Sequence, residues 1–374
     1  MSEAASLQPS RSRFSSICAF ITRWLFPWAR SNRQIECFGT TVEVLAQLGE
    51  GAFSHVYLVW SRTPIGSGPP GTYALKQMVQ PRENRQNIER EIRAHEVVHG
   101  HAHLLELVGS EVRTSPSNPD AVEALLLFPY CEGGTLAKAQ AAAPGGFAES
   151  QALQIMAQLC DAVAHCHSHG VTHRDIKLTN VYLHDGRWIL ADLGSATLSA
   201  ERAVLHEREA LALARHEVET LTTPEYRAPE QVGLQLGSAL GPEVDVWALG
   251  VTLFQLACSA NPYATPLATL SERALCAAEA RAGVEVKGLL DSMLAREPEQ
   301  RCSASEALAR CRAAVARDGA TAGAAAGLSA PNVEPDDHPP ASPARTKARS
   351  YEKLATATPG SEGGPSTEAD VAHV

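Results

Sequence analysis

The hydrophobic pattern of the chain changes near Pro129, and this change limits the folds that the chain can adopt. Before Pro129, short apolar runs between turn residues predict strands at 42–48, 56–60, 73–78, 104–112 and 122–128, with one helix at 85–98. After it, apolar residues recur at helical spacing over 150–169, 243–257 and 303–315. This α+β order predicts a mostly β lobe and a mostly α lobe with a cleft between them.

Composition divides the 374 residues into three regions. Residues 1–33 are rich in Ser, Arg and aromatic side chains, and residues 34–317 alternate apolar runs with turn signals. Residues 318–374 are rich in Ala, Pro, Ser and Gly, so they cannot bury enough apolar surface to offset the entropy of the chain. We therefore expect one folded region at 34–317, followed by a disordered tail.

Charge and cysteine content exclude several classes of protein. With 44% hydrophobic residues the chain can bury a core, and its net charge of -10 argues against a nucleic-acid binder that relies on bulk electrostatics. The nine cysteines include no C-x-x-C pair, which favours a reducing compartment over a disulfide framework or a zinc ribbon. Histidines at 99, 101 and 103, and at 165, 167 and 169, could ligate a metal, but the carboxylates and the ligand spacing of a structural site are missing.

The segment VTHRDIKLTNVYL, residues 171–183, carries five charged, imidazole or amide side chains within an apolar run. They are His173, Arg174, Asp175, Lys177 and Asn180. Burying charged groups is costly unless they are paired or used in chemistry. Because the pattern turns here from helix to strand, Asp175 and Asn180 are expected on a loop, where an aspartate can accept a proton and an asparagine oxygen can bind a metal.

Two stretches of the predicted β lobe could meet an anionic ligand. In LGEGAFSHVYLV, residues 48–59, Gly49 and Gly51 have no Cβ to obstruct a bulky anion, although an ordinary hairpin turn would use the same residues. Lys76 lies within an apolar strand, where a lysine usually reaches solvent but can also give a cleft a fixed positive charge. Glu91, on the following helix, is a candidate to pair with Lys76 and direct its ammonium group.

A second metal-ligand candidate ends the next apolar run. In ILADLG, residues 189–194, Asp192 follows a short strand and Gly194 permits a tight turn. Mg²⁺ takes one or two such oxygen ligands and fills its other positions with phosphate and water. Asp192 and Asn180 are therefore the candidate ligands of Mg²⁺.

These motifs occur in the order that is typical of the eukaryotic protein kinases, which the chain resembles from about residue 38 to residue 315. TPEYRAPE at 223–230 and DVWALG at 245–250 agree with the resemblance. It implies a bilobal kinase fold, with a five-stranded antiparallel sheet and one helix in an N-lobe at 34–129, and a mainly helical C-lobe at 130–317. It also implies transfer of the γ-phosphoryl group of MgATP to protein substrates, on Ser or Thr, as Lys177 and Thr223 suggest.

The resemblance implies roles for individual residues. Asp175, Lys76 and Lys177 would be catalytic, with Asp175 accepting the proton of the substrate hydroxyl. Asn180 and Asp192 would bind Mg²⁺. The residues implied to contact ATP or to hold its site in place are Leu48, Gly49, Gly51, Phe53, Val56, Ala74, Lys76, Glu91, Phe128, Tyr130, Cys131, Asn180 and Asp192.

Among kinases, the chain is most similar to the Numb-associated kinase family and its serine/threonine kinase 16 branch, the myristoylated and palmitoylated kinases. The similar features are Phe-Ser after the second glycine, DLGSA at 192–196, and a helix-favouring run at 207–219 before TPEYRAPE. Leu178 replaces a usual proline, Leu193 a usual phenylalanine, and Ser2 the glycine that N-myristoylation requires. The resemblance implies an activation segment that is held by folding more than by phosphorylation.

Residues 11–30 have the pattern of an amphipathic membrane anchor. Apolar residues from Phe14 to Trp28 recur three or four positions apart among arginines. Arg23 and Pro27 interrupt the run, so it is too short to span a membrane, and the alternatives are packing against the folded region or an organelle transit peptide. Cys18 is a candidate for palmitoylation, and the family resemblance implies the cytoplasmic face of secretory-pathway membranes such as the Golgi, or otherwise the cytoplasm.

Two other functions fit parts of this sequence. A pseudokinase or scaffold would keep the fold and nucleotide binding without the chemistry, but such proteins typically lack one of the positions filled here by Lys76, Asp175, Asn180 and Asp192. A kinase for a small molecule or a lipid is disfavoured by TPEYRAPE, which would form a platform for a peptide. The expected function is therefore that of a serine/threonine protein kinase.

Overall fold

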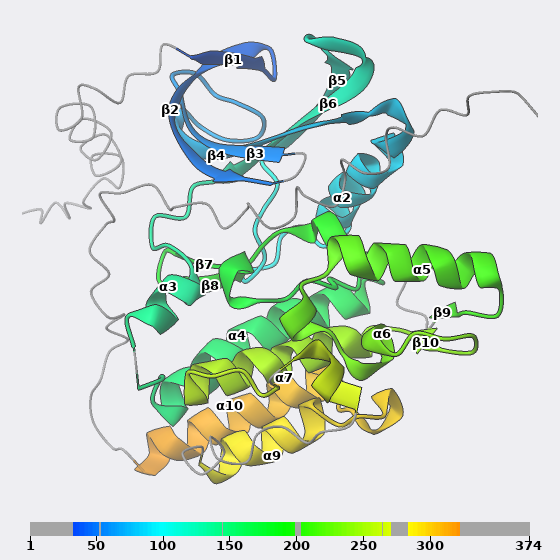
Figure 1. Cartoon of the computed structure of the whole chain (residues 1–374). Coiled ribbons are helices and arrows are strands. Elements are labelled where there is room, and N and C mark those ends of the chain that lie inside the picture. The colour runs from blue at the N-terminus through cyan, green and yellow to red at the C-terminus, as the bar shows by residue number, and fades with distance from the viewer. Residues whose placement is uncertain are drawn as a thin grey trace, which may run out of the picture.

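The computed structural model describes residues 33–51, 54–143, 145–198, 203–263, 265–270 and 283–321, which form two lobes (Figure 1). The N-terminal lobe is a curled antiparallel sheet with the strand order β1-β2-β3-β4-β6-β5. The C-terminal lobe is mainly helical. This architecture confirms the bilobal α+β fold that the sequence predicts.

The elements of the N-lobe are β1 (Gln34–Cys37), β2 (Thr40–Glu50), β3 (Ser54–Ser61), β4 (Gly71–Pro81), α2 (Arg85–Val97), β5 (Gly109–Ser115) and β6 (Asn118–Pro129). Successive side chains of β4 point to opposite faces of the sheet. Tyr73 and Leu75 enter a core with β1, β2 and β3, whereas Met78 enters a second core with Ile88 of α2. Lys76 shares the face of Met78, so the strand itself directs this lysine toward α2.

The sheet differs from the prediction at two places. It has six strands rather than five, because Gln34–Cys37 forms the edge strand β1 with a pattern too short to stand out in the sequence. The strand predicted at 104–112 begins only at Gly109. The residues before it turn toward the C-lobe, where the N–H of Leu105 donates to the carbonyl of Leu190 at 2.9 Å. The apolar run at 104–108 therefore joins the lobes instead of extending the sheet.

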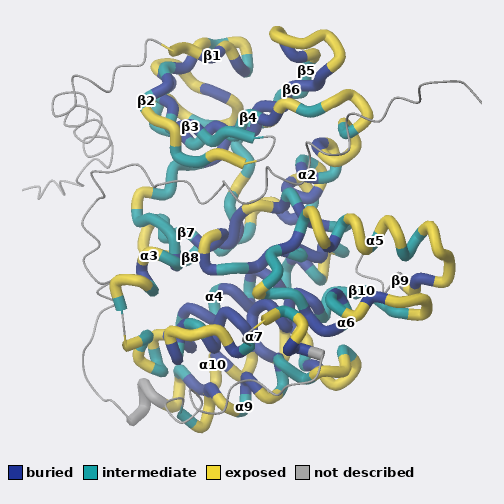
Figure 2. The backbone as a smooth tube through the Cα atoms, viewed as in Figure 1, coloured by how far each residue is buried: buried dark blue, intermediate teal, exposed yellow. Residues whose placement is uncertain are grey.

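The helices of the C-lobe are α3 (Leu136–Ala141), α4 (Glu149–Ser168), α5 (Arg208–Leu221), α6 (Pro229–Val232), α7 (Glu243–Cys258), α9 (Val284–Met293) and α10 (Ala304–Thr321). Two small antiparallel sheets accompany them, β7 (Val181–His184) with β8 (Arg187–Leu190), and β9 (Ala203–Val204) with β10 (Ala239–Leu240). Helices α4, α7, α9 and α10 supply most of the largest apolar core, and α7 is buried along almost its whole length (Figure 2). This core supports the loops that lie between the lobes.

The last helix shows how local signals set its boundaries. Ser303 Oγ accepts from the N–H of Glu306 at 3.2 Å, and Glu306 Oε2 accepts from the N–H of Ser303 at 2.8 Å, which is a capping box that starts α10. The helix continues to Thr321, past the predicted start of the tail. None of the helices in the described ranges has the length and hydropathy needed to cross a membrane. The predicted anchor at 11–30 and tail residues 322–374 lie outside the described residues.

Candidate active site

Lys76, Glu91 and Asp192 form a charge cluster that joins the two lobes. Lys76 on β4 places its Nζ 2.7 Å from Glu91 Oε1 on α2 and 3.0 Å from Asp192 Oδ1, which follows β8. The side chains of Lys76 and Glu91 are 17% and 5% exposed, whereas that of Asp192 is 47% exposed. Asp192 is therefore the member of the cluster that a ligand can approach most easily.

Lys76 and Asp192 each favour the charged form of the other. Burial alone would lower the pKa of Lys76, but the charges of Asp192 and Glu91 outweigh it and raise that pKa above its ordinary value. The charge of Lys76 lowers the pKa of Asp192, although burial opposes this effect. Lys76 is thus a fixed cation and Asp192 a fixed anion at neutral pH.

Asp175, in the loop between α4 and β7, lies at the centre of a hydrogen-bond network. Its Oδ2 accepts from Lys177 Nζ at 2.6 Å, and its Oδ1 accepts from the hydroxyl and the N–H of Thr223 at 2.6 and 3.0 Å. Lys177 Nζ also donates to Thr223 Oγ1 at 2.8 Å. Two segments far apart in the sequence therefore meet at a single carboxylate.

Asn180 and Asp192 offer oxygen atoms that suit Mg²⁺. The amide nitrogen of Asn180 donates to the carbonyl of Asp175 at 2.9 Å, and no hydrogen bond among the described residues uses its Oδ1. Asp192 has a left-handed backbone with φ at 68°, and Gly194 leaves space beside it, because a Cβ there would lie 3.2 Å from Asp192 Oδ1. Two oxygen ligands fit an ion that completes its shell with phosphate and water.

The two histidine clusters pack against each other. The ring of His165 lies 4.6 Å from that of His101 and 4.2 Å from that of His169, measured between centroids. Across the described part of the chain, no group of three or more His, Cys, Asp or Glu side chains is placed to hold a metal. These imidazoles thus contribute ring packing between α4 and the segment after α2.

The Gly-rich segment lies where β2 ends and β3 begins. Gly49 pairs with Val56 across the two strands, and the N–H of Gly51 donates to the carbonyl of Ser54 at 2.7 Å. A Cβ on Gly51 would lie 2.7 Å from Ser54 Oγ, so a larger residue there would require the Ser54 side chain to rotate. Phe53, which the sequence assigns to the nucleotide site, lies outside the described residues.

The other residues assigned to nucleotide contact lie on the N-lobe strands and just beyond β6. Ala74 of β4 pairs with Phe128 of β6, whose side chain is buried. Leu48, Ala74, Tyr130 and Cys131 are half-buried, and the Cys131 thiol lies 4.0 Å from the carbonyl of Pro129. These positions present partly covered apolar surface, the kind of surface on which an aromatic base can rest.

The protein kinase domain family matches residues 42–311, which is most of the chain. The chain belongs to the protein kinase family. The kinase is 31% identical to human serine/threonine-protein kinase 16 over 273 residues, which are 69% of this chain and 85% of the human protein. It is 32% identical to a probable serine/threonine-protein kinase of Dictyostelium discoideum over 233 residues, and these residues are 60% of this chain. The actin-regulating kinase PRK1 of Saccharomyces cerevisiae is 28% identical over 282 residues, 72% of this chain and 34% of that protein.

Several relatives of this kinase are much longer than the part that matches. The kinase spans 28% and 19% of two Dictyostelium discoideum relatives and 25% of a Schizosaccharomyces pombe serine/threonine-protein kinase. The kinase therefore matches only part of each of these relatives.

Sequence reasoning missed a residue that holds the loop around Asp175. The buried carboxylate of Asp245, at the start of α7, accepts from the backbone N–H groups of His173 and Arg174 at 2.8 and 2.7 Å. Its Oδ2 also lies 2.9 Å from His167 Nε2. Arg174 has a left-handed backbone with φ at 69°, a conformation that persists only where its surroundings enforce it. The acidic residue in DVWALG was the available signal, because a buried carboxylate needs donors.

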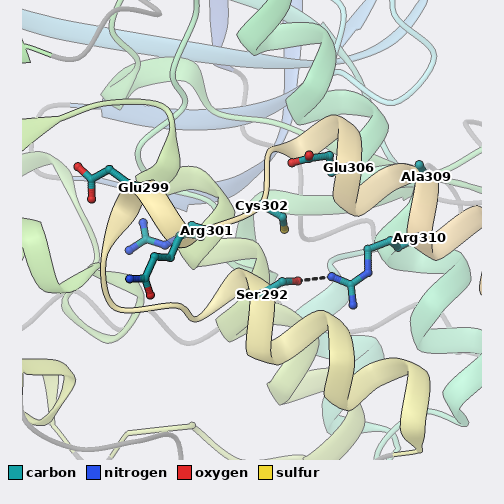
Figure 3. A pocket seen from close by; sticks show the side chains of 8 residues that line it. Ser292, Glu299, Arg301, Cys302, Glu306, Ala309 and Arg310 are labelled. Carbon is teal, nitrogen blue, oxygen red and sulfur yellow. Dashed lines mark hydrogen bonds between the residues drawn. The ribbon is translucent and has the colours of Figure 1, made fainter.

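A separate cavity of about 590 Å³ lies at the base of the kinase (Figure 3). It is lined by residues of η6 (Pro298–Gln300), the end of α9 and the start of α10, and Arg310 donates to Ser292 Oγ there at 2.6 Å. It shares no lining residue with the charge cluster or the loop around Asp175.

Proposed function

We propose that this kinase transfers the γ-phosphoryl group of MgATP to serine or threonine residues of protein substrates. The environment of Asp175 carries the proposal, because both of its oxygens accept hydrogen bonds while Lys177 and Thr223 flank it. Kinase family membership and similarity to serine/threonine kinases support it.

Asp175 would act as the proton acceptor. It is buried and fixed by Lys177, Thr223 and Asn180, so its position is set before a substrate binds. A carboxylate held in this way can take the proton of an incoming hydroxyl as the hydroxyl oxygen attacks phosphorus. Lys177, whose Nζ lies 2.6 Å from Asp175, is positioned to stabilise negative charge on the transferred group.

The charge cluster would hold the nucleotide. Lys76 would contact phosphate oxygens, and Glu91 keeps its ammonium group on the side of Asp192. Asn180 and Asp192 would hold Mg²⁺, which supplies neutralisation of charge on phosphate oxygens when it is bound. Because these side chains are positioned by other parts of the protein, little rearrangement is needed at the moment of transfer.

The first test compares the wild-type chain with Asp175→Asn. The amide cannot accept a proton, so the variant should transfer labelled phosphate from ATP about 10² to 10⁴ times more slowly. The acceptors are a generic Ser/Thr substrate and the kinase itself, and nucleotide binding is measured in parallel. Asp120→Asn, an exposed substitution on β6, is the matched control and should leave the rate unchanged.

Two results would overturn this proposal. If Asp175→Asn transfers phosphate as fast as the wild type, Asp175 is not the base. If the wild type binds ATP but transfers nothing, the chain acts as a nucleotide-binding scaffold.

We also propose that residues 11–30 attach the kinase to the cytoplasmic face of a secretory-pathway membrane. Trp24 and Trp28 among arginines favour the interface between lipid headgroups and chains. Palmitoylation of Cys18 would add the second signal that stable anchoring requires. Similarity to human serine/threonine-protein kinase 16, and the helix α5 before TPEYRAPE, support placing the kinase in that branch of the Numb-associated kinases.

A further inference from the structure

One carboxylate of helix α5 bridges the two halves of the active site. Glu217 Oε2 accepts from Arg174 Nη1 at 2.9 Å, and Glu217 Oε1 accepts from Arg90 Nη1 at 3.2 Å. The side chains of Arg90 and Glu217 are each 25% exposed and that of Arg174 is 12% exposed, so this bridge is screened from much of the solvent. We call these three residues the α5 bridge.

The two arginines are each adjacent in sequence to a residue of the proposed chemistry. Arg174 precedes Asp175, and Arg90 precedes Glu91, the partner of Lys76. Glu217 therefore contacts both the loop that carries the base and the helix that directs the lysine. Figure 1 shows α5 close to α2, and the ion pair of Arg90 with Glu217 joins the two helices.

Helix α5 is followed almost directly by Thr223, which contacts Asp175. It ends at Leu221, and Thr223 follows with both its hydroxyl and its N–H donating to Asp175. A shift of α5 would move Thr223 as well as Glu217. The position of α5 thus fixes Thr223, which contacts Asp175, and Glu217, which contacts Arg174.

Glu217 is the counter-ion of the buried guanidinium of Arg174. Burial would raise the pKa of Glu217, but its hydrogen bonds and charge attraction to Arg174 and Arg90 lower it, so Glu217 is ionised at neutral pH. Arg174 has a second terminal nitrogen, Nη2, that is buried and has no partner among the described residues. Glu217 thus supplies the anion that this buried guanidinium contacts.

Nearby hydroxyl groups are already engaged in the fold. Ser195 and Thr222 are buried, and their hydroxyls donate to the carbonyls of Leu221 and Val218. Phosphate on either residue would require these contacts to break. Thr220 is exposed, but its hydroxyl donates to the carbonyl of His216 within α5.

We propose that Glu217 is a positioning residue that aligns Asp175 and the Lys76–Glu91 pair through Arg174 and Arg90, so that α5 keeps the site assembled without phosphate on the segment. This inference rests on the proposed function. It assigns to a built-in carboxylate the ion pairing that a phosphate group would otherwise supply to an arginine pair.

The test measures kcat and KM of the full chain after phosphatase treatment. Glu217→Gln should lower kcat about 10- to 100-fold, because misplacing a reacting group by about 1 Å can cost 10²-fold. The KM for ATP should change by a smaller factor than kcat, because the residues of the α5 bridge are not expected to touch the nucleotide and reach it only through the Lys76–Glu91 pair. Glu217→Asp keeps the charge and should recover part of kcat. Glu219→Gln, on the exposed side of the same helix, is the control and should match the wild type.

A second variant covers the case in which Glu217→Gln fails to fold. Arg90→Gln keeps the contact of Glu217 with Arg174 and removes only the contact with α2, so it should also lower kcat, by a smaller factor. The thermal midpoint of each variant, measured with the same preparations, separates loss of alignment from loss of the folded state.

The outcomes separate this inference from the proposed function. A wild type that is inactive before phosphatase treatment would overturn the proposed function and this inference with it. A wild type that is active but loses its activity on phosphatase treatment would overturn this inference alone. Full activity in Glu217→Gln would also overturn this inference alone. If Glu217→Gln is unfolded, full activity in Arg90→Gln would overturn it instead.

Discussion

At the scale of single residues, His95 is a buried group whose protonation the fold opposes. It lies on α2, four residues after Glu91, is 4% exposed, and its ring packs 5.1 Å from that of Phe128. Its Nε2 has no hydrogen-bond partner among the described residues. Burial, followed by the charge of Lys76, lowers the pKa of His95 from 6.5 to about 4. The folded kinase therefore keeps this imidazole neutral at pH values where the unfolded chain protonates it.

This shift predicts a loss of stability in mild acid. Between pH 6.5 and pH 4 the unfolded chain binds a proton at His95 and the folded kinase does not, so the free energy of unfolding falls as the pH falls. Between pH 7 and pH 5 the wild type should lose about 2 kcal/mol more than His95→Leu does. Urea unfolding at both pH values measures this difference.

The control for His95 is an exposed histidine. The matched substitution is His216→Gln, at an exposed position of α5. Equal losses of stability in the wild type and in His95→Leu would show that His95 does not couple protonation to folding.

Residues of the candidate site were easier to name from sequence than the contacts that hold them. Lys76, Glu91, Asp175 and Asn180 stand in short motifs whose order is recognisable in the sequence. Their supports come from elsewhere: Asp245 lies far along the chain from the backbone groups that it accepts from. The acidic residue in DVWALG indicates that donors exist, but which backbone groups donate to it depends on how the helices pack.

At the scale of elements, one buried ion pair ties the segment before α10 to α6. Arg301 donates from Nη1 and Nη2 to the two oxygens of Glu230 at 2.8 and 3.2 Å. Their side chains are 0% and 9% exposed, and Arg301 lies over the ring of Trp247 of α7 at 5.2 Å. Arg301 also donates to the carbonyl of Glu243, where α7 begins. Three elements thus depend on a single guanidinium.

Removing one partner of this pair should be costly. Glu230→Gln leaves the charge of Arg301 buried without its counter-ion, and we expect the free energy of unfolding to fall by about 3–5 kcal/mol. Denaturant titration with a common slope measures the change.

A pair on the surface provides the comparison. Arg93 and Glu96 of α2 are 3.1 Å apart with side chains 64% and 52% exposed, so Glu96→Gln should cost less than about 1 kcal/mol. If both variants lose the same small amount, the Arg301–Glu230 pair does not hold the three elements together.

Elements with long periodic patterns were predicted correctly from the sequence, whereas some short elements were not. The run predicted to favour helix at 207–219 forms α5, and apolar spacing located α4 and α7. Strand β1 and the start of β5 were missed, because four residues of alternating burial carry little signal and an apolar run can join lobes as readily as extend a sheet. The pairing of Leu105 with Leu190 decided the second case, and it links residues 85 positions apart.

At the scale of the whole molecule, the candidate site exists only where both lobes contribute. Lys76 and Glu91 come from the N-lobe, whereas Asp175, Asn180 and Asp192 come from the C-lobe. The ion pair of Lys76 with Asp192 and that of Arg90 with Glu217 both cross between the lobes. These ion pairs lie beside an apolar core that both lobes share, because Ala94, Val98 and Leu104 of the N-lobe pack in one cluster with residues of the C-lobe helices.

The region before the N-lobe bears on where the folded kinase acts. Arg33, the first described residue, donates to Tyr57 Oη at 2.8 Å and places its guanidinium 4.5 Å from the centre of that ring. Arg33 therefore belongs to the folded part, and a deletion should end at residue 32 to keep its contacts. Removing residues 1–32 should then separate membrane binding from folding and phosphate transfer.

The full chain should sediment with vesicles that contain anionic lipid, and the chain lacking residues 1–32 should remain in the supernatant. Interfacial binding combines burial of apolar side chains with attraction between arginine and anionic headgroups. The double variant Trp24→Glu with Trp28→Glu should therefore reduce binding of the full chain, and added salt should weaken it.

Removing residues 343–374, the same number of residues from the tail, controls for chain length and should leave sedimentation unchanged. Because bilayer contact would come from residues 11–30, all versions should transfer phosphate at the same rate in solution. Equal sedimentation of the full and shortened chains would rule out the extension as the anchor and leave the two alternatives, packing against the folded region or an organelle transit peptide.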